Sequence, residues 1–321
     1  MPSLFEARLR YASHYETVLR GLNDLYLEGG AALALGLLLF DMEWPNIRAG
    51  WSEAEGLRGK DERAGRLCLS YPRVGAALLN MRLHPRERLQ WLEVGLECAR
   101  RLGDRRAEGR HLGDLGMAYA ALGETHHAAE LFDRRRRLAC DVGDRLGEAS
   151  ALGNLGNVGV STGDRHRAVE YYKQALALYR ETGTRRGEAD ALSNLGVAYR
   201  DLGETGSAAE CHEGAVAIYR EIGYRRGEGQ ALNNWGIVYR KTGRHQDALE
   251  LFEQALTIFR ELHDPRGEAF ALWNMSMTNY TRGDRDAAVA GAQVSLSIFI
   301  RLEDPKADQV RRQLIRWRGG E

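Results

Sequence analysis

Apolar residues recur at intervals of three and four along most of the chain, a pattern that predicts amphipathic α-helices. Residues 185–224 show it twice. The first run contains Ala189, Leu192, Leu195, Gly196, Tyr199 and Leu202, and the second contains Ala208, Cys211, His212, Ala215, Ile218, Tyr219 and Ile222. Gly203 lies between the runs and Gly223 follows the second, where each is expected to end a helix.

The same pattern returns after 40 residues. Residues 225–264 align with 185–224 without a gap, and further steps of 40 give copies 105–144, 145–184, 185–224, 225–264 and 265–304. A fixed period of this length predicts a solenoid of stacked helical pairs. Each copy has a Glu soon after the turn, as at Glu188 and Glu228, where negative charge suits the first turn of a helix.

The copies resemble the tetratricopeptide pattern of a large residue, Leu-Gly, Tyr and two Ala positions. One copy carries Leu192, Leu195, Gly196, Tyr199, Ala208 and Ala215, and the next carries Leu232, Trp235, Gly236, Tyr239, Ala248, Phe252 and Ala255. Their 40-residue length is similar to that of kinesin light chains and of the Leu-Gly-Asn-repeat spindle adaptor. The resemblance implies an all-α, right-handed α-α superhelix with an N-terminal helical cap and a C-terminal capping helix.

The ends of the chain depart from the repeat. Residues 1–60 predict a helical cap or adaptor, with a break at Gly29–Gly30, a helix buried on all sides over Ala31–Phe40 and a helix that restarts at Trp44-Pro45. Residues 61–104 predict a degenerate first repeat with an irregular hinge between its helices, and residues 305–321 predict a capping helix.

A second resemblance concerns residues 1–60. His14-Tyr15 followed by Glu43-x-x-Asn46-Ile47-Arg48-Ala49 is similar to the helical adaptor that precedes the repeats in bacterial STAND-type signalling ATPases. The phosphate-binding motif G-x-x-x-x-G-K-[ST] does not occur in the sequence. If the chain derives from such a system, we expect the ATPase to be a separate protein.

Composition narrows the classes of partner. The sequence has 45 basic and 45 acidic residues, so no overall field favours nucleic acid or an anionic membrane. The longest apolar run, Ala31–Phe40, is too short to span a bilayer, and we see no signal peptide. The four cysteines are widely spaced, which indicates a reducing compartment, and we expect a cytoplasmic location.

The resemblance to tetratricopeptide repeats also implies that the residue before Leu-Gly in each copy faces a concave groove. That column is Asp114, Asn154, Asn194, Asn234 and Asn274. A side-chain amide both donates and accepts, so an Asn ladder can hold the backbone of an extended peptide. The alternative is that each Asn bonds the neighbouring repeat. Helical spacing adds Asn157, Asn233, Arg200 and Arg240 to this face, where the two Arg either engage an acidic ligand or pair with Asp190 and Asp201.

The fifth copy has an apolar stripe where the others are polar: Phe270, Trp273, Met277 and Tyr280. Such a stripe is typical of an interface for a ligand or a homodimer. The alternative is that the final helix, Ala307–Trp317, folds onto it as a cap.

No catalytic or metal-binding constellation is recognisable, so we predict neither an enzyme nor a cofactor. The sequence instead predicts a scaffold that holds an extended protein or peptide segment in its concave groove. Three alternatives remain open: a sensor or regulatory module of a STAND-type ATPase system, a self-associating structural scaffold, and a receptor for a small molecule or peptide pheromone.

Overall fold

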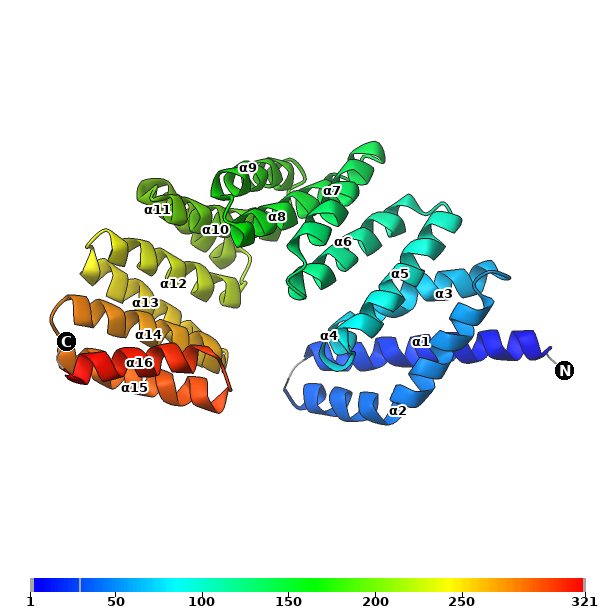
Figure 1. Ribbon diagram of the computed structural model, residues 1–321, viewed down its shortest axis with the longest axis horizontal. Coiled ribbons are helices and arrows are strands. Elements are labelled where there is room, and N and C mark those ends of the chain that lie inside the picture. The colour runs from blue at the N-terminus through cyan, green and yellow to red at the C-terminus, as the bar shows by residue number, and fades with distance from the viewer. Residues whose placement is uncertain (1–2, 29, 320–321) are drawn as a thin grey trace. The chain divides into compact units, whose positions relative to one another are not determined.

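The computed structural model describes residues 3–28 and 30–319. Within these residues there are sixteen α-helices and no strand, which confirms the predicted all-α repeat fold. The chain divides into two compact units, Met1–Val158 and Gly159–Glu321, and α8 crosses the division (Figure 1).

The first unit contains α1 (Leu4–Glu28), α2 (Gly30–Leu57), α3 (Glu62–Val74), α4 (Ala76–Arg82), α5 (Pro85–Arg101), α6 (Arg105–Ala121), α7 (Thr125–Asp141) and most of α8 (Arg145–Thr162). The second contains α9 (Arg165–Glu181), α10 (Arg185–Leu202), α11 (Thr205–Glu221), α12 (Arg225–Lys241), α13 (His245–Glu261), α14 (Pro265–Thr281), α15 (Arg285–Arg301) and α16 (Lys306–Gly319).

The start of the chain differs from its prediction in two respects. The predicted restart at Trp44-Pro45 is wrong, because α2 runs without interruption through Pro45. Pro45 and Asp41, whose carbonyl loses its helical hydrogen bond, are both exposed, so water can satisfy that carbonyl. The helix is also not buried on all sides, since Leu38 is 60% exposed while Phe40 is 1% exposed. Gly30 has a φ of +56°, and Gly29 lies outside the described residues.

The irregular hinge expected within residues 61–104 is the short helix α4. Its first N–H groups, those of Ala77 and Leu78, donate to Oδ1 of Asn23 on α1 at 3.0 and 3.3 Å. The Tyr71 hydroxyl donates to the Ala12 carbonyl at 2.7 Å, inside a core rich in aromatic side chains. These side-chain bonds hold α3 and α4 against α1.

Within the repeats a helix ends once every 20 residues. Gly203 and Gly223 have φ values of +84° and +68°, so both lie in the left-handed region that favours glycine, as predicted for helix stops. His263 and Glu303 take the equivalent places with φ values of +48° and +52°. The turn geometry is therefore kept even where glycine is replaced.

The Glu column joins successive repeats, which goes beyond the expected favourable placement in the first turn. Glu228 is 3% exposed and accepts from Nε of Arg220 on α11 at 2.7 Å and from a guanidinium nitrogen of Arg225 at 2.6 Å. Glu188 and Glu108 repeat this arrangement with arginines at the same spacing. The column therefore ties the second helix of one repeat to the first helix of the next.

We expect Glu228→Gln to lower the free energy of unfolding by about 1–3 kcal/mol, because it weakens two charge-assisted hydrogen bonds at a buried acceptor. Urea unfolding followed by circular dichroism measures the change. Glu261→Gln is the control, since Glu261 also pairs with Arg225 but is 54% exposed, and its loss should cost less than about 1 kcal/mol. If Glu228→Gln and Glu261→Gln lower the free energy of unfolding equally, the Glu column does not stabilise the contact between successive repeats.

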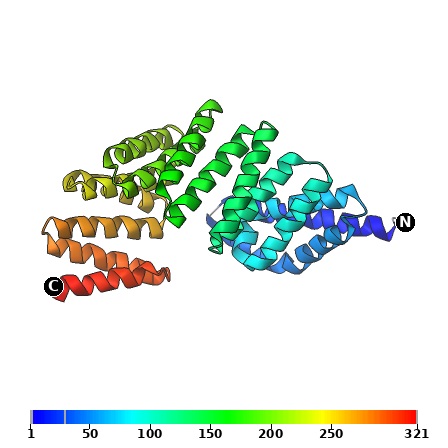
Figure 2. The same cartoon turned by 45° about the horizontal axis from the view of Figure 1, so that its top comes forward.

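The last helix covers the apolar stripe of the fifth copy. Trp317 on α16 stacks on Trp273 with ring centroids 5.8 Å apart and on Tyr280 with centroids 4.6 Å apart. Trp273 is 6% exposed as a result. Helices α14, α15 and α16 lie side by side at the C-terminal end of the second unit (Figure 2). The structure thus favours a cap over an exposed interface at this stripe.

Candidate functional site

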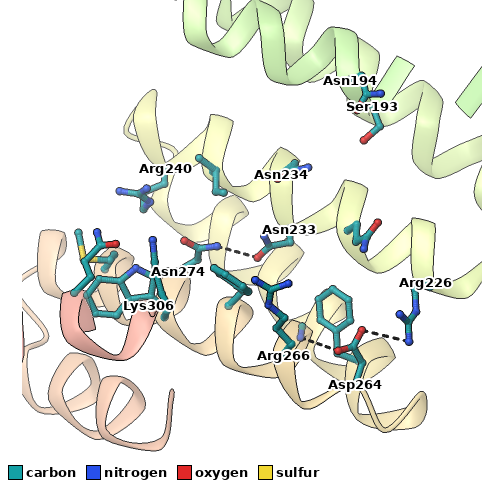
Figure 3. Close-up of a pocket in the computed structure, with 18 residues that line it drawn as sticks. Ser193, Asn194, Arg226, Asn233, Asn234, Arg240, Asp264, Arg266, Asn274 and Lys306 are labelled. Carbon is teal, nitrogen blue, oxygen red and sulfur yellow. Dashed lines mark hydrogen bonds and ion pairs between the residues drawn. The ribbon is translucent and has the colours of Figure 1, made fainter. Parts of the chain in front are cut away.

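A groove of about 760 Å³ lies in the second unit and is lined from α10, α12, α14 and α16, with Phe259 of α13 and Asp264, the N-cap of α14 (Figure 3). Of the residues predicted for the site, it brings together Asn194, Asn233, Asn234, Arg240, Phe270, Trp273, Asn274 and Met277. The step of 40 places equivalent residues of successive repeats along one wall.

The side-chain amides differ in what they already bind. Asn194 and Asn234 are half-buried, and their side-chain amides form no hydrogen bond with any described residue. The donors and acceptors of these two amides are therefore available. Asn274 is 8% exposed, and its Nδ2 donates to Oδ1 of Asn233 at 3.0 Å (Figure 3). For Asn274 the structure therefore shows the alternative, a bond to the neighbouring repeat. Asn233 keeps its own amide donors.

The two predicted arginines also differ. Nε and a terminal nitrogen of Arg200 donate to Oδ1 of Asp201 at 3.0 and 2.8 Å, and Arg200 does not line the groove. Arg240 lines the groove, forms no ion pair with a described residue, and has a buried Nε without an acceptor. Burial, and then the positive charge of Arg200, lowers the pKa of Arg240. Arg240 is therefore the guanidinium that lacks a counter-charge here.

Three further basic residues line the groove and were missed by the sequence analysis. Arg226 lies 3.7 Å from Asp264, and Arg266 donates to Asp304 at 2.9 Å. The Lys306 ammonium lies 5.9 Å from the centre of the Phe270 ring. Arg226, Arg266 and Lys306 are spaced 40 residues apart, so the repeat period could have identified them as one column.

Other predicted residues lie outside the groove lining. Asn154 and Asn157 belong to the part of α8 in the first unit. Tyr280 is half-buried against Trp317, and Trp273 reaches the groove while most of its surface is covered. The stripe is therefore not a freely exposed apolar interface, because α16 occupies that surface.

Within residues 3–28 and 30–319 no group of three or more His, Cys, Asp or Glu side chains is placed to hold a metal ion. None of the described helices is long and apolar enough to cross a membrane. The groove, with its amides and basic residues, is thus the candidate on which the functional argument rests.

Comparison with known proteins agrees with the repeat geometry. Residues 143–221 and 227–301 match the family model of the tetratricopeptide repeat. A search of curated proteins gave no significant match. Solved structures that share the fold include BtubC (BKLC) from P. vanneervenii, at 20% identity, with a TM-score of 0.61 and coverage of 68% of this chain and 92% of that one.

Two further solved structures are similar in fold. The kinesin light chain TPR-like repeats of Podosopora anserina are 19% identical, with a TM-score of 0.52 over 60% of this chain and 95% of that one. Aspartyl phosphate phosphatase F from Bacillus subtilis is 10% identical, with a TM-score of 0.65 over 99% of this chain and 95% of that one. At these identities the likeness concerns the fold alone. The chain therefore carries tetratricopeptide repeats over residues 143–221 and 227–301, within an all-α repeat fold similar to that of kinesin light chain proteins.

Proposed function

We propose that this chain is a non-catalytic scaffold that binds a protein or peptide partner and holds an extended segment of it in the groove of the second unit. The observation that carries the proposal is the meeting of Asn194, Asn234 and Arg240 in one groove, all without a bond to a described side chain. The buried Nε of Arg240 lacks an acceptor, and the two half-buried amides are open to a ligand, which the stacking of repeats alone does not explain.

The amides supply contacts that do not depend on the partner's sequence. Each Asn offers an acceptor and two donors, which matches the carbonyl and N–H groups of an extended backbone. Asn194 and Asn234 are 40 residues apart on successive repeats, so a segment that follows the stack would meet them in turn. Asn233 adds free donors, because only its oxygen is engaged by Asn274.

Arg240 supplies charge selection. We assign contact with an acidic side chain of the partner to Arg240 alone, because Asp201 already neutralises Arg200. A carboxylate of the partner would provide the acceptor that the buried Nε of Arg240 lacks. Phe270 and Met277 would contact an apolar neighbour of that acidic residue.

We further propose a cytoplasmic location, no cofactor, and no membrane or nucleic-acid partner, because the charge is balanced and the four cysteines are widely spaced. A homodimer through the Trp273 stripe is not proposed, because α16 covers most of that surface. The STAND-type and pheromone-receptor hypotheses stay predictions from sequence.

The test uses peptides selected from a random dodecapeptide library on the intact chain. We expect Asn194→Ala/Asn234→Ala to weaken binding about 10- to 50-fold, at roughly 1 kcal/mol for each lost amide contact. The melting temperature should stay within about 2 °C of the parent, because neither amide bonds a described residue. Fluorescence anisotropy and thermal unfolding provide the two readings.

Two further variants sharpen the test. Arg240→Gln should weaken acidic peptides about 10-fold and leave neutral ones unchanged. Gln174→Ala, an exposed amide on α9 outside the groove, should change nothing. Unchanged affinity in the double Asn variant, or affinity and melting temperature lost together, would count against the groove as the binding site.

A further inference from the structure

The first unit has a cleft of its own, between α2 and α5. Its volume is about 480 Å³, and its lining includes Trp51 and Glu55 from α2 and Trp91, Glu93 and Glu97 from α5. It is separate from the groove of the second unit, and the proposed function does not use it. No sequence motif pointed to it, because its lining residues belong to two separate helices and those from different helices are at least 32 positions apart, as Glu55 and Glu87 are.

The deep part of the cleft is aromatic. The rings of Trp51 and Trp91 stack with centroids 4.4 Å apart and an interplanar angle of 12°, and Trp44 stacks on Trp91 at 5.9 Å. Trp51 and Trp91 are only 5% and 3% exposed, so each reaches the cleft along a narrow edge. This rigid stack fixes the distance between α2 and α5.

The indole nitrogens of Trp51 and Trp91 have no hydrogen-bond partner among the described residues. Neither Trp51 nor Trp91 forms a hydrogen bond with a described residue, and neither Nε1 is among the fully enclosed polar atoms. Each N–H therefore keeps some access to solvent, and each residue lines the cleft, although more than nine-tenths of it is buried. Such a donor can bond water in the free chain and an acceptor such as a peptide carbonyl in a complex.

The rim of the cleft is negatively charged. It carries four glutamates, namely Glu55, Glu87, Glu93 and Glu97. Arg48 pairs with Glu87 at 3.1 Å, and Arg58 lies 3.8 Å from Glu55 and 3.4 Å from Glu97. Four carboxylates against two guanidiniums leave a net charge of two negative around the indole donors, which repels anions such as nucleotides.

We propose that this cleft binds a basic peptide segment of a partner protein, with a Lys or Arg side chain among Glu55, Glu93 and Glu97 and backbone carbonyls on the indole N–H groups of Trp51 and Trp91. The indole donors can pair with an acceptor, and Glu93, which forms no ion pair with a described residue, can pair with a cation. A peptide carrying Lys or Arg has both, whereas a polyamine has no carbonyl and a nucleic acid has the wrong charge. This proposal does not rest on the function proposed for the second unit.

The test follows the indole N–H resonances of the six tryptophans in ¹H–¹⁵N spectra of the full chain, with Trp51 and Trp91 assigned from Trp→Phe variants. The probe is the pentapeptide acetyl-Gly-Arg-Gly-Arg-Gly-amide. We expect it to shift the Trp51 and Trp91 signals, and added NaCl to weaken the effect. The matched Glu pentapeptide should shift neither signal, and spermidine should shift them less than the Arg pentapeptide.

Variants of the rim provide the second reading. Glu93→Gln, which disturbs no ion pair with Arg58, should weaken pentapeptide binding roughly 2- to 5-fold, and Glu93→Gln/Glu97→Gln should weaken it further. Glu253→Gln, exposed on α13 in the second unit, is the matched control. Unmoved indole signals, equal shifts with the Glu pentapeptide, or unchanged binding in the Gln variants would each overturn the proposal.

A second copy of the chain is the competing occupant. Helix α16 carries Arg312, Arg316 and Arg318, which form no ion pair with a described residue. If the Trp51 and Trp91 signals move with protein concentration alone, and Arg312→Gln/Arg316→Gln stops that movement, the cleft binds α16 of another copy. That result would replace the proposed partner.

Discussion

Replacing Trp317 with alanine is expected to lower the free energy of unfolding of the second unit by about 3–5 kcal/mol, the usual cost of truncating a buried tryptophan. Trp317 is 4% exposed and stacks on both Trp273 and Tyr280. Its Nε1 is buried without a partner, so the contribution comes from apolar packing. Urea unfolding measures the loss.

The same substitution should expose the Trp273 stripe. Because α16 buries it through Trp317, Leu314 and Val310, we expect increased dye binding to apolar surface and a tendency to self-associate. Ile315→Ala is the control on the same helix, since Ile315 is 65% exposed and its truncation should cost less than about 0.5 kcal/mol. If Trp317→Ala also lowers the free energy of unfolding by less than about 0.5 kcal/mol, α16 does not act as a cap.

Replacing His212 with phenylalanine is expected to raise the free energy of unfolding by about 1–3 kcal/mol at neutral pH. His212 on α11 is fully buried, and neither ring nitrogen has a hydrogen-bond partner. Steps of 40 place Phe132 and Phe252 at the equivalent positions, where both are buried beneath a glycine of the preceding helix. Phenylalanine therefore suits the site without two unsatisfied nitrogens.

The gain should grow as the pH falls. Burial, and then the charge of Arg200, lowers the pKa of His212 from its ordinary value of 6.5 to about 3 in the folded chain. The unfolded chain then binds more protons between these values. The free energy of unfolding of the parent is therefore unaffected by this titration above about pH 6.5. Below that pH it falls by about 1.4 kcal/mol for each pH unit.

Phenylalanine removes this contribution, so the difference between the variant and the parent should widen by about 3 kcal/mol between pH 6.5 and 4.5. His111, whose pKa burial lowers to about 4, contributes a slope of its own to both proteins. His126→Phe is the control, because the His126 side chain is 88% exposed. Parallel pH profiles for the parent and the His212 variant would refute the assignment.

Local periodicity accounts for what could be predicted. The step of 40, the three-and-four spacing and the glycines at helix ends are short-range signals, and they predicted the helical pairs and their stops. The same step placed Asn194 and Asn234 at equivalent positions, helical spacing put Arg240 on the same face, and all three line the groove. Residues that share a register in a solenoid also share a face, so the sequence could indicate this part of the site.

Pairing between side chains decided the rest. Arg200 and Arg240 occupy equivalent positions of successive repeats, yet Asp201 engages Arg200 and no described carboxylate pairs with Arg240. It also left open whether Asn274 faces a ligand or its neighbour, and whether the Trp273 stripe is covered.

By itself, then, the sequence determined the repeat, the helices and the face that lines the groove, because each depends on spacing along one chain. Only the tertiary structure decided which polar groups stay unsatisfied and which surfaces α16 covers. It also brought together the Trp51–Trp91 cleft, whose halves come from α2 and α5. Those outcomes depend on distances between separate helices, and side-chain packing sets these distances.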